Sequence, residues 1–203
     1  VDYVFTPTPE QIYPRGHCLS IDVGPLGHML EGRFRPGHFA GVATILLKRF
    51  HLIPSDIAFF GTKDYQQLKV VERMVEDSNL PIQIIGCPTV REEDGLAMSS
   101  RNQLLTAADR LQAKCVYESF QQAQIMVTAG ERKSEKIIQK MRQHIHHANG
   151  KIDYVALVDP STLQPQQHII ENILGLIAVR IGSIRLIDNW LIQVNTDQSS
   201  LHQ

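Results

Sequence analysis

The sequence predicts an α/β protein with two sheets of different kinds. Up to about residue 90, short apolar runs that fit buried strands alternate with segments of helical periodicity, the pattern of a parallel sheet flanked by helices. After that point, two helical segments precede three runs rich in Val, Ile and Leu, which predict a small antiparallel sheet. We therefore expect two domains, residues 1–90 and residues 91–203.

The first domain is expected to hold two long helices. Apolar residues recur at spacings of three and four from Phe39 to Phe50 and from Leu68 to Val75, which places each set on one helix face. Loops are expected where prolines and glycines gather, because proline cannot donate to a strand ladder. The expected strands are residues 1–5, 18–23, 57–60 and 82–85.

In the second domain, residues 91–102 are polar and without a period, so they are expected to form a loop. One helix is expected from Thr106 to about Ala129, and another from Ser134 to His147, ending at Asn149-Gly150. The expected strands are residues 154–158, 173–181 and 184–194, with a hairpin turn at Gly182-Ser183 and a frayed tail from Asn195.

Composition excludes several classes of protein. A hydrophobic content of 43% and a charged content of 20% fit a folded chain. The net charge of −1 predicts no broad surface for nucleic acid or membranes, and no apolar run reaches the ~18 residues of a membrane span. Cys18, Cys87 and Cys115 form no CxxC pair and no secretory leader is visible, so we expect free thiols in the cytoplasm.

The segment from Ala58 to Leu68 is the first candidate site. Its order is apolar run, glycine, polar residues and then helical pattern, which predicts a strand, a tight turn and a helix. Ligands bind beyond the carboxyl ends of strands in open α/β sheets, where Lys63 suits phosphate and Asp64 suits ribose hydroxyls. The alternative is structural: Asp64 as N-cap with Gln67 closing a capping box. By itself the segment favours that alternative.

The segment Met98-Ser99-Ser100-Arg101 is the second candidate site. Two adjacent hydroxyls and a guanidinium can surround a phosphate, although an ordinary polar connector fits the same residues. Together with Lys63 and Asp64, the segment favours a nucleotide site near the domain boundary. No metal site is predicted, because His144, His146 and His147 lack Cys, Asp or Glu at matching spacing.

Three segments carry a resemblance to a known family: Arg35 to Phe39, Gly61 to Leu68, and Asp94 to Asn102. Together they resemble pantothenate synthetase (pantoate–β-alanine ligase). Shorter matches at Tyr13-Pro14, Val90 to Glu92 and Arg185 to Asn189 fit the same family, in order from residue 1 to about 194. The resemblance implies a Rossmann-like nucleotide-binding domain of the HIGH-motif superfamily, followed by a smaller α/β domain that carries the antiparallel sheet.

The resemblance also implies a two-step reaction. Pantoate attacks the α-phosphate of ATP, with Mg²⁺ as cofactor, to give pantoyl adenylate and pyrophosphate; β-alanine then displaces AMP to give pantothenate. Gln67 matches a pantoate-binding glutamine, and family members are commonly homodimers. Lys63, Ser99, Ser100 and Arg101 are the expected catalytic residues, because they can stabilise charge on the phosphate. The matching ATP-binding positions are Gly61, Thr62, Lys63, Asp64, Val90, Met98, Ser99, Ser100 and Arg101.

Two departures from the family pattern stand out. Thr62 replaces a usual glutamate, with a small expected effect because its neighbours carry the contacts. The family's HIGH-like segment, with its catalytic histidine and a further substrate glutamine, has no counterpart because the chain starts at Val1, after both. We therefore expect the remainder of a nucleotide-binding domain, and an incomplete catalyst when the chain acts alone.

Two alternatives remain open at the level of sequence. The chain fits another adenylating or nucleotidyl-transferring member of the same superfamily, which should lack a glutamine that reads pantoate. It also fits a folded fragment without catalytic activity.

Overall fold

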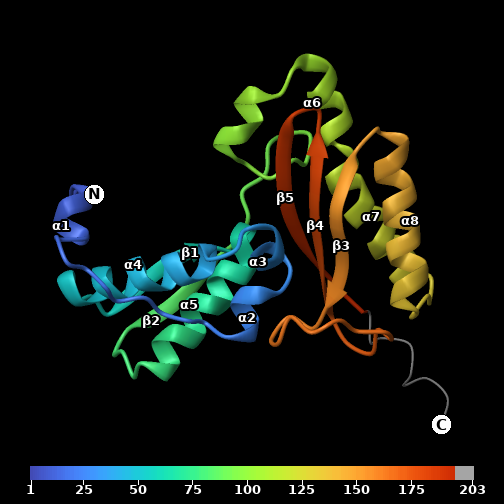
Figure 1. Ribbon diagram of the computed structural model, residues 1–203. Coiled ribbons are helices and arrows are strands. Elements are labelled where there is room, and N and C mark those ends of the chain that lie inside the picture. Colours follow the sequence, from blue (N-terminus) through green and yellow to red (C-terminus); the bar gives the residue numbers. More distant parts are fainter. Residues whose placement is uncertain (195–203) are drawn as a thin grey trace, which may run out of the picture. The chain divides into compact units, whose positions relative to one another are not determined.

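The computed structural model describes residues 1–194 and contains two compact units (Figure 1). Residues 1–60 and 66–87 form the first unit. Gly61–Tyr65 and the described chain from residue 88 to residue 194 form the second. The domain division at residue 90 stays a prediction, because the short segment Gly61–Tyr65 groups with the later part of the chain. The tail from Asn195, expected to fray, lies outside the described residues.

The first unit combines helices with a two-stranded parallel sheet of β1 and β2, as the alternating pattern predicted. Strand β2 follows helix α5, and its first residue, Gln83, donates its backbone N–H to Asp56 O at 2.8 Å. The elements are α1 (Pro9–Ile12), α2 (Pro25–His28), α3 (Glu31–Phe34), α4 (His38–Leu52), β1 (Ile57–Gly61), α5 (Tyr65–Asp77) and β2 (Gln83–Cys87).

Helices α4 and α5 build the core of this unit. Phe39 and Ala43 of α4 are buried against Val70, Val71 and Met74 of α5, and these spacings of three and four are those that predicted the two helices. The partly buried side chains packed against this cluster include several from the two strands. The first unit is therefore held together by one apolar layer between helices and sheet.

Two predicted strands of the first unit are wrong. Residues 1–5 and 18–23 have no strand pairing, and Tyr3 is 94% exposed. Apolar residues give a segment a local preference for the extended conformation. A strand also needs a neighbouring strand to which its backbone N–H and C=O groups can hydrogen-bond. Neither segment forms a helix. A short helix, α1, lies between them, where Thr8 and Gln11 close a capping box: Gln11 Oε1 accepts from Thr8 N at 2.8 Å, and Thr8 Oγ1 accepts from Gln11 N at 3.4 Å.

The second unit is an antiparallel sheet of order β3-β4-β5, as predicted. Figure 1 shows α7 and α8 lying over one face of this sheet. The elements are the 3₁₀ helices η1 (Thr62–Asp64) and η2 (Ser100–Leu104), the helices α6 (Ala107–Ala113), α7 (Cys115–Thr128) and α8 (Ser134–His147), and the strands β3 (Lys151–Val158), β4 (Ile173–Ile181) and β5 (Ile184–Ile192).

Local signals set the boundaries of these elements. The hairpin turn at Gly182-Ser183 is confirmed: Ile181 pairs with Ile184, and Gly182 has φ +55°, a conformation that favours glycine. The predicted end of α8 is confirmed too, since Asn149 adopts φ +57° and the next amide donates to Ile145 O at 2.9 Å. The single helix expected from Thr106 to Ala129 is two helices that meet at Lys114.

The core of the second unit lies between the helices and the sheet. Phe120 of α7, and Ile137, Met141 and Ile145 of α8, are fully buried. A Cβ on Gly175 of β4 would stand 3.0 Å from the Phe120 ring, so glycine there lets the ring lie against the strand. This dry layer fixes β4 between its two neighbours, and with it the strand β5 that reaches the candidate site.

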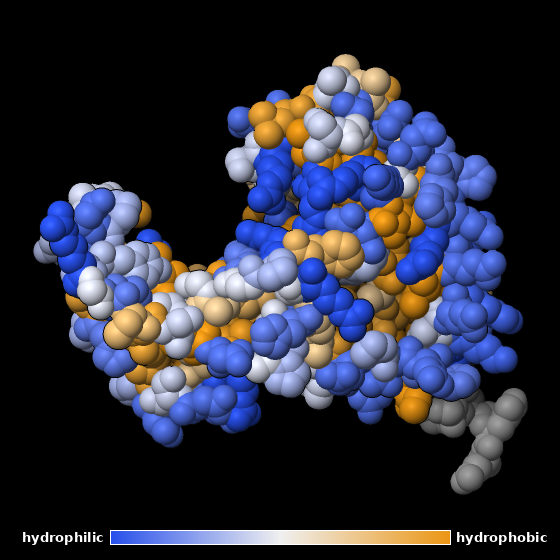
Figure 2. Space-filling model, in the orientation of Figure 1, coloured by the Kyte–Doolittle hydropathy of each residue, from blue (hydrophilic) through white to orange (hydrophobic). Residues whose placement is uncertain are grey.

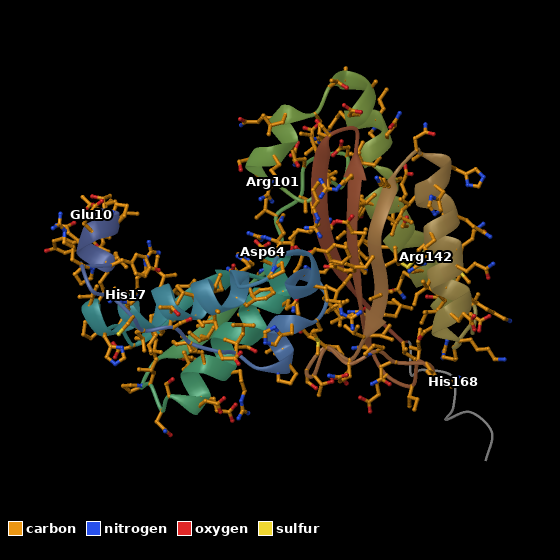
Figure 3. All side chains as sticks on the ribbon, viewed as in Figure 1. Glu10, His17, Asp64, Arg101, Arg142 and His168 are labelled. Atoms are coloured by element: carbon orange, nitrogen blue, oxygen red, sulfur yellow. The ribbon has the colours of Figure 1, made fainter. Side chains whose placement is uncertain are left out.

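The outer surface of α8 is polar. Figure 2 shows hydrophilic side chains along the right edge, where α8 lies, and Arg142 of that helix, labelled in Figure 3, is exposed. Within residues 1–194, no helix combines the length and the apolarity needed to cross a membrane.

Candidate functional site

The first candidate segment forms a tight turn at the end of β1. The strand ends at Gly61, the 3₁₀ helix η1 contains Lys63 and Asp64, and α5 begins directly afterwards at Tyr65. Lys63 Nζ lies 3.7 Å from Asp64 Oδ1, and the Lys63 side chain is 19% exposed. The strand, turn and helix are confirmed. The capping-box alternative is wrong, because Asp64 lies inside the helical turn and Gly61 occupies the N-cap position.

The second candidate segment follows a small antiparallel turn. Arg91 bridges to Ala97, and Met98 N donates to Val90 O at 2.9 Å. The 3₁₀ helix η2 then begins at Ser100, where Ser99 Oγ accepts from Arg101 N at 3.2 Å. The segment expected to be an aperiodic loop is therefore ordered by backbone pairing and a capped turn.

Ion pairs between this turn and helix α6 stabilise the turn. Arg110 of α6 donates to Glu92 Oε2 at 2.7 Å and to both carboxylate oxygens of Asp94 at 2.8 Å. The hydrogen bond from Arg110 lowers the pKa of Glu92 and a further one from Asn102 adds to this, while Glu92 in turn raises the pKa of Arg110. Asn102 is buried and also donates to Ala97 O at 3.0 Å. These contacts hold the Ser99–Arg101 backbone in place.

Lys63, Ser99 and Arg101 line one cavity of about 10 Å³ in the second unit, which is room for about one water molecule. Two charged residues of β5, Arg185 and Asp188, line it as well. Figure 3 labels Asp64 and Arg101, which come from the turns η1 and η2. The structure therefore brings together residues from the two segments that the sequence singled out. The full lining is Lys63, Leu96, Ala97, Ser99, Arg101, Asn102, Val116, Arg185, Leu186, Ile187 and Asp188.

The remaining predicted site residues do not line this cavity. Most of them are sequence neighbours of residues that do, and one belongs to the first unit. Of the described residues, those that line the cavity do not include Gly61, Thr62, Asp64, Val90, Met98 or Ser100. Thr62 Oγ1 lies 3.3 Å from Thr89 Oγ1, Val90 is 64% exposed and Met98 is 55% exposed. Gln67 belongs to the first unit, where it is half-buried.

Sequence reasoning matched Asp188 and Asn189 of β5 to the family but assigned no role to their side chains. Arg91 donates to Asp188 Oδ2 at 2.7 Å and to Asp188 Oδ1 at 3.1 Å. Burial raises the pKa of Asp188, and the hydrogen bonds and charge of Arg91 oppose that rise. Asn189 donates from Nδ2 to the carbonyl oxygens of Thr62 and Lys63. The available signal was a charged residue inside an apolar strand, since such a residue needs a partner.

Gln66 is a second residue whose role was missed. Its side chain is buried and accepts from Glu31 N at 3.1 Å while donating to Leu26 O at 2.7 Å and Met29 O at 2.9 Å. It therefore connects α5 to α2 and α3 within the first unit. The neighbouring Gln67 has no such role among the hydrogen bonds of the described residues, which leaves its side chain available to a ligand.

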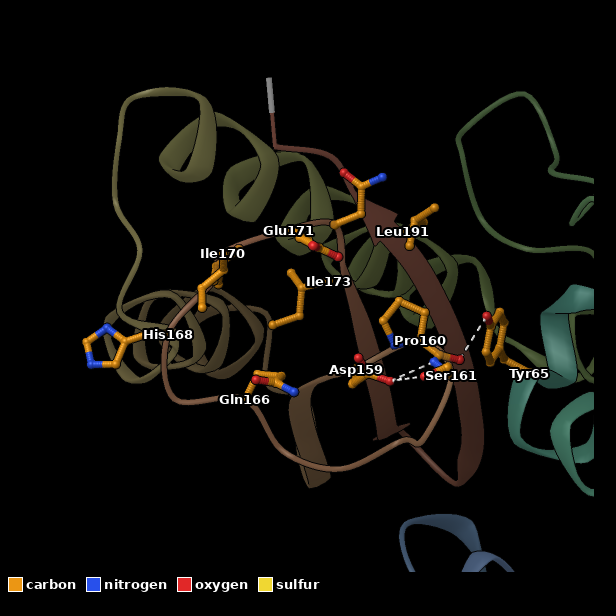
Figure 4. Close-up of a pocket in the computed structure, with 12 residues that line it drawn as sticks. Tyr65, Asp159, Pro160, Ser161, Gln166, His168, Ile170, Glu171, Ile173 and Leu191 are labelled. Carbon is orange, nitrogen blue, oxygen red and sulfur yellow. Dashed lines mark hydrogen bonds between the residues drawn. The ribbon is translucent and has the colours of Figure 1, made fainter. Parts of the chain in front are cut away.

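A larger cavity of about 570 Å³ lies in the loop between β3 and β4 (Figure 4). Tyr65 Oη donates to Pro160 O at 3.2 Å. Asp159 accepts at Oδ1 from the backbone amides of Ser161 and Thr162 at 2.8 and 2.7 Å, and from their hydroxyls. The Ser161 hydroxyl, followed by the Thr162 amide, lowers the pKa of Asp159 to about 2. Asp159 therefore organises the wall of this cavity as an anion.

The histidines and cysteines show no metal chemistry in the part of the chain that the structure describes. No three His, Cys, Asp or Glu side chains of residues 1–194 converge on a point. His144 instead lies 2.8 Å from Glu118 Oε2, across the contact of α8 with α7. The three cysteines are free, as expected, and burial raises the pKa of Cys115 to about 12.

Comparison with known proteins gives one consistent result. The family model "Pantoate-beta-alanine ligase" matches residues 1–191. The pantothenate synthetase of Aquifex aeolicus is 48% identical over 196 residues, which cover 95% of this chain and 69% of that protein. That of Syntrophotalea carbinolica is 45% identical over 190 residues, covering 93% and 67%.

Solved structures agree with this match. The crystal structure of pantothenate synthetase from Thermus thermophilus superposes with a TM-score of 0.91 at 39% identity, covering 95% of this chain and 70% of that one. Pantoate–β-alanine ligase from Francisella tularensis, complexed with β-γ ATP and β-alanine, gives a TM-score of 0.69 at 32% identity, covering 90% and 61%.

The fold and these matches define an α/β enzyme of the ligase class. The chain belongs to the pantoate–β-alanine ligase family, whose matching members are pantothenate synthetases. The family assignment made from the three motifs is confirmed. The family model matches from residue 1, so the expectation of a missing HIGH-like segment is not supported by it.

The Asp159 turn yields a prediction about acid stability. Replacing Asp159 by Ala should lower the free energy of unfolding by about 1 kcal/mol at pH 7, because the turn loses its shared acceptor. The folded pKa lies below the ordinary value of 3.8, so this contribution is present above about pH 4 and is lost as the pH falls towards 2. Urea unfolding at several pH values measures it.

The matched control is Asp2→Ala, at an exposed position of the first unit. It should leave the unfolding free energy within about 0.5 kcal/mol of the original. A difference between Asp159→Ala and the original chain that stays constant from pH 6 to pH 3 would contradict the assignment.

Proposed function

We propose that the chain takes part in the ATP-dependent condensation of pantoate with β-alanine, giving pantothenate, AMP and pyrophosphate through pantoyl adenylate. The observation that carries the proposal is the meeting of Lys63, Ser99 and Arg101 at one cavity. Two cations and a hydroxyl are the groups that phosphate oxygens accept from. Family membership and the ATP-complexed relative from Francisella tularensis support the same substrate.

The first chemical step would be carried by the cations. A carboxylate oxygen of pantoate attacks the α-phosphorus of ATP, the bond to the pyrophosphate oxygen breaks, and negative charge accumulates on the phosphate oxygens. Lys63 and Arg101 would stabilise that charge more in the transition state than in the ground state. Ser99 and Ser100 would donate their hydroxyls to the same oxygens.

The second step would release the nucleotide. The amine of β-alanine attacks the acyl carbon, the bond to the AMP oxygen breaks, and the amine loses a proton as the amide forms. Because water hydrolyses an acyl adenylate, this step gains from a site that excludes water. The half-buried Lys63, 19% exposed at its side chain, fits such a site.

The roles of the remaining predicted residues belong to the same proposal. Gly61, Thr62, Asp64, Val90 and Met98 would contact the nucleotide, and Gln67 would bind pantoate through its free amide. Mg²⁺ would neutralise phosphate charge when bound with ATP, and such ions use few protein carboxylates; Asp64, 49% exposed at its side chain, is the carboxylate nearest Lys63. We also propose that the protein is cytoplasmic and forms a homodimer.

Lys63→Met tests the nucleotide site. We expect ATP to bind roughly 10- to 100-fold more weakly, because one charge-assisted hydrogen bond to phosphate is lost. Titration calorimetry with the whole chain measures the dissociation constant without requiring turnover. Lys140→Met on the exposed surface of α8 is the control and should bind like the original. Equal binding by Lys63→Met would sink the proposed phosphate contact.

Gln67→Ala separates this function from other adenylating enzymes. The change should weaken pantoate binding by about tenfold and leave ATP binding nearly unchanged, because the lost amide contacts only pantoate. Gln139→Ala, also on the exposed surface of α8, is the matched control. Equal losses for ATP and pantoate would favour another adenylating member of the superfamily.

Neither the structure nor the family match tests the expectation that this chain is an incomplete catalyst by itself. An assay of AMP formation from ATP, pantoate and β-alanine, with a characterised pantothenate synthetase as the reference, measures its activity directly.

A further inference from the structure

A buried ion pair lies directly behind the Lys63 turn. The Arg91 guanidinium faces the Asp188 carboxylate with two hydrogen bonds of 2.7 and 3.1 Å. The Asp188 side chain is 2% exposed and that of Arg91 is 16% exposed. Replacing such pairs by apolar residues is often neutral or stabilising. Their presence therefore calls for a role other than stability.

Several further contacts restrict the position of Arg91. Besides Asp188, its guanidinium donates to Gly95 O at 2.9 Å and to Asn189 O at 3.1 Å. It also lies 5.2 Å from the ring centre of Tyr117 and 5.0 Å from that of Trp190, within the range of cation–π attraction. The two ring centres are 5.6 Å apart, so both rings lie on the same side of the guanidinium, and together with the hydrogen bonds they restrict its orientation.

Asn189 extends this network to the candidate site. Asp188 Oδ1 accepts from Asn189 N at 2.7 Å. The Asn189 amide nitrogen donates to Thr62 O at 2.9 Å and to Lys63 O at 2.7 Å. Asn189 is 7% exposed, so water cannot readily replace these two bonds. The backbone of η1 is thereby tied to β5.

We propose that Arg91, Asp188 and Asn189 are positioning residues that hold the Thr62–Lys63 backbone, so that the Lys63 ammonium stands at the phosphate site beside Ser99 and Arg101. The inference rests on the proposed function and adds to it a set of residues that act through the backbone of Lys63; one of them, Asp188, also lines the cavity. Lysine has a long flexible stem. Its reach is useful only when the backbone from which it extends does not move.

The two acceptors explain why asparagine suits this position. One NH₂ group supplies two hydrogens, one for each carbonyl oxygen. Asn189→Leu keeps a similar volume and loses both bonds. Asn189→Ser retains one short donor. If the network acts by positioning, ATP affinity should fall in the order Asn, Ser, Leu, with roughly a tenfold loss for Leu.

The experiment uses the whole chain and ATP as the probe. Dissociation constants for the original, Asn189→Ser and Asn189→Leu are measured by calorimetry, with thermal unfolding as a check on folding. Asn172→Leu is the matched control: it lies in the loop before β4, where its Oδ1 accepts from Val194 N, and it should bind ATP like the original. The Ser variant keeps the test open if the Leu variant does not fold.

A double-mutant cycle separates positioning from a general structural effect. If Asn189 acts through Lys63, then Asn189→Leu should cost little additional affinity in a Lys63→Met background. The same fold-loss in both backgrounds overturns the proposal, as does an Asn189→Leu chain that binds ATP like the original. A chain that binds no ATP in its original form refutes the proposed function instead, so the two failures are distinct.

Discussion

The ion pair between Arg91 and Asp188 is the constraint on which the candidate site in the second unit depends. Two charges that leave water carry a large desolvation cost, which is offset only when hydrogen bonds satisfy both partners. Arg91 and Asp188 meet this condition through carbonyl oxygens and amides of the surrounding backbone. Every one of those groups must therefore stay in place. The turn at Val90–Met98 and the strand β5 are thus fixed relative to each other by one guanidinium.

The apolar core supplies the rigidity that this ion pair needs. Phe120, Met141 and Ile177, from α7, α8 and β4, are fully buried in one layer. Close-packed interiors resist small displacements, so the adjacent strand β5 presents Asp188 at a defined position. Exposed residues such as Arg101 have no core of their own. Their backbone is held by short capped turns. Those turns are themselves held by the buried charged residues that contact them.

Local patterns predicted the elements whose causes are local. The hairpin at Gly182, the end of α8 at Asn149 and the bounds of β4 follow from periodicity and turn chemistry within a few residues. The strands expected at residues 1–5 and 18–23 failed because pairing partners are not local. The aperiodic segment at residues 91–102 gained order from Arg110 and from Asp188, which is 97 positions distant from Arg91.

The residues of the candidate site also divide into those that the sequence predicted and those whose role only the fold revealed. Lys63, Ser99 and Arg101 were predicted because their two segments were considered together and both match the family; each segment by itself also fitted a structural role. Asp188 and Asn189 were visible as part of the short family match from Arg185 to Asn189, and as a charge and an amide inside the apolar run from Ile184 to Ile192. Such a pattern requires a partner but does not name it. Only the fold identifies these partners, because they are distant in sequence. Asp188 pairs with Arg91 in the turn that precedes Ser99, and Asn189 binds the backbone of Lys63.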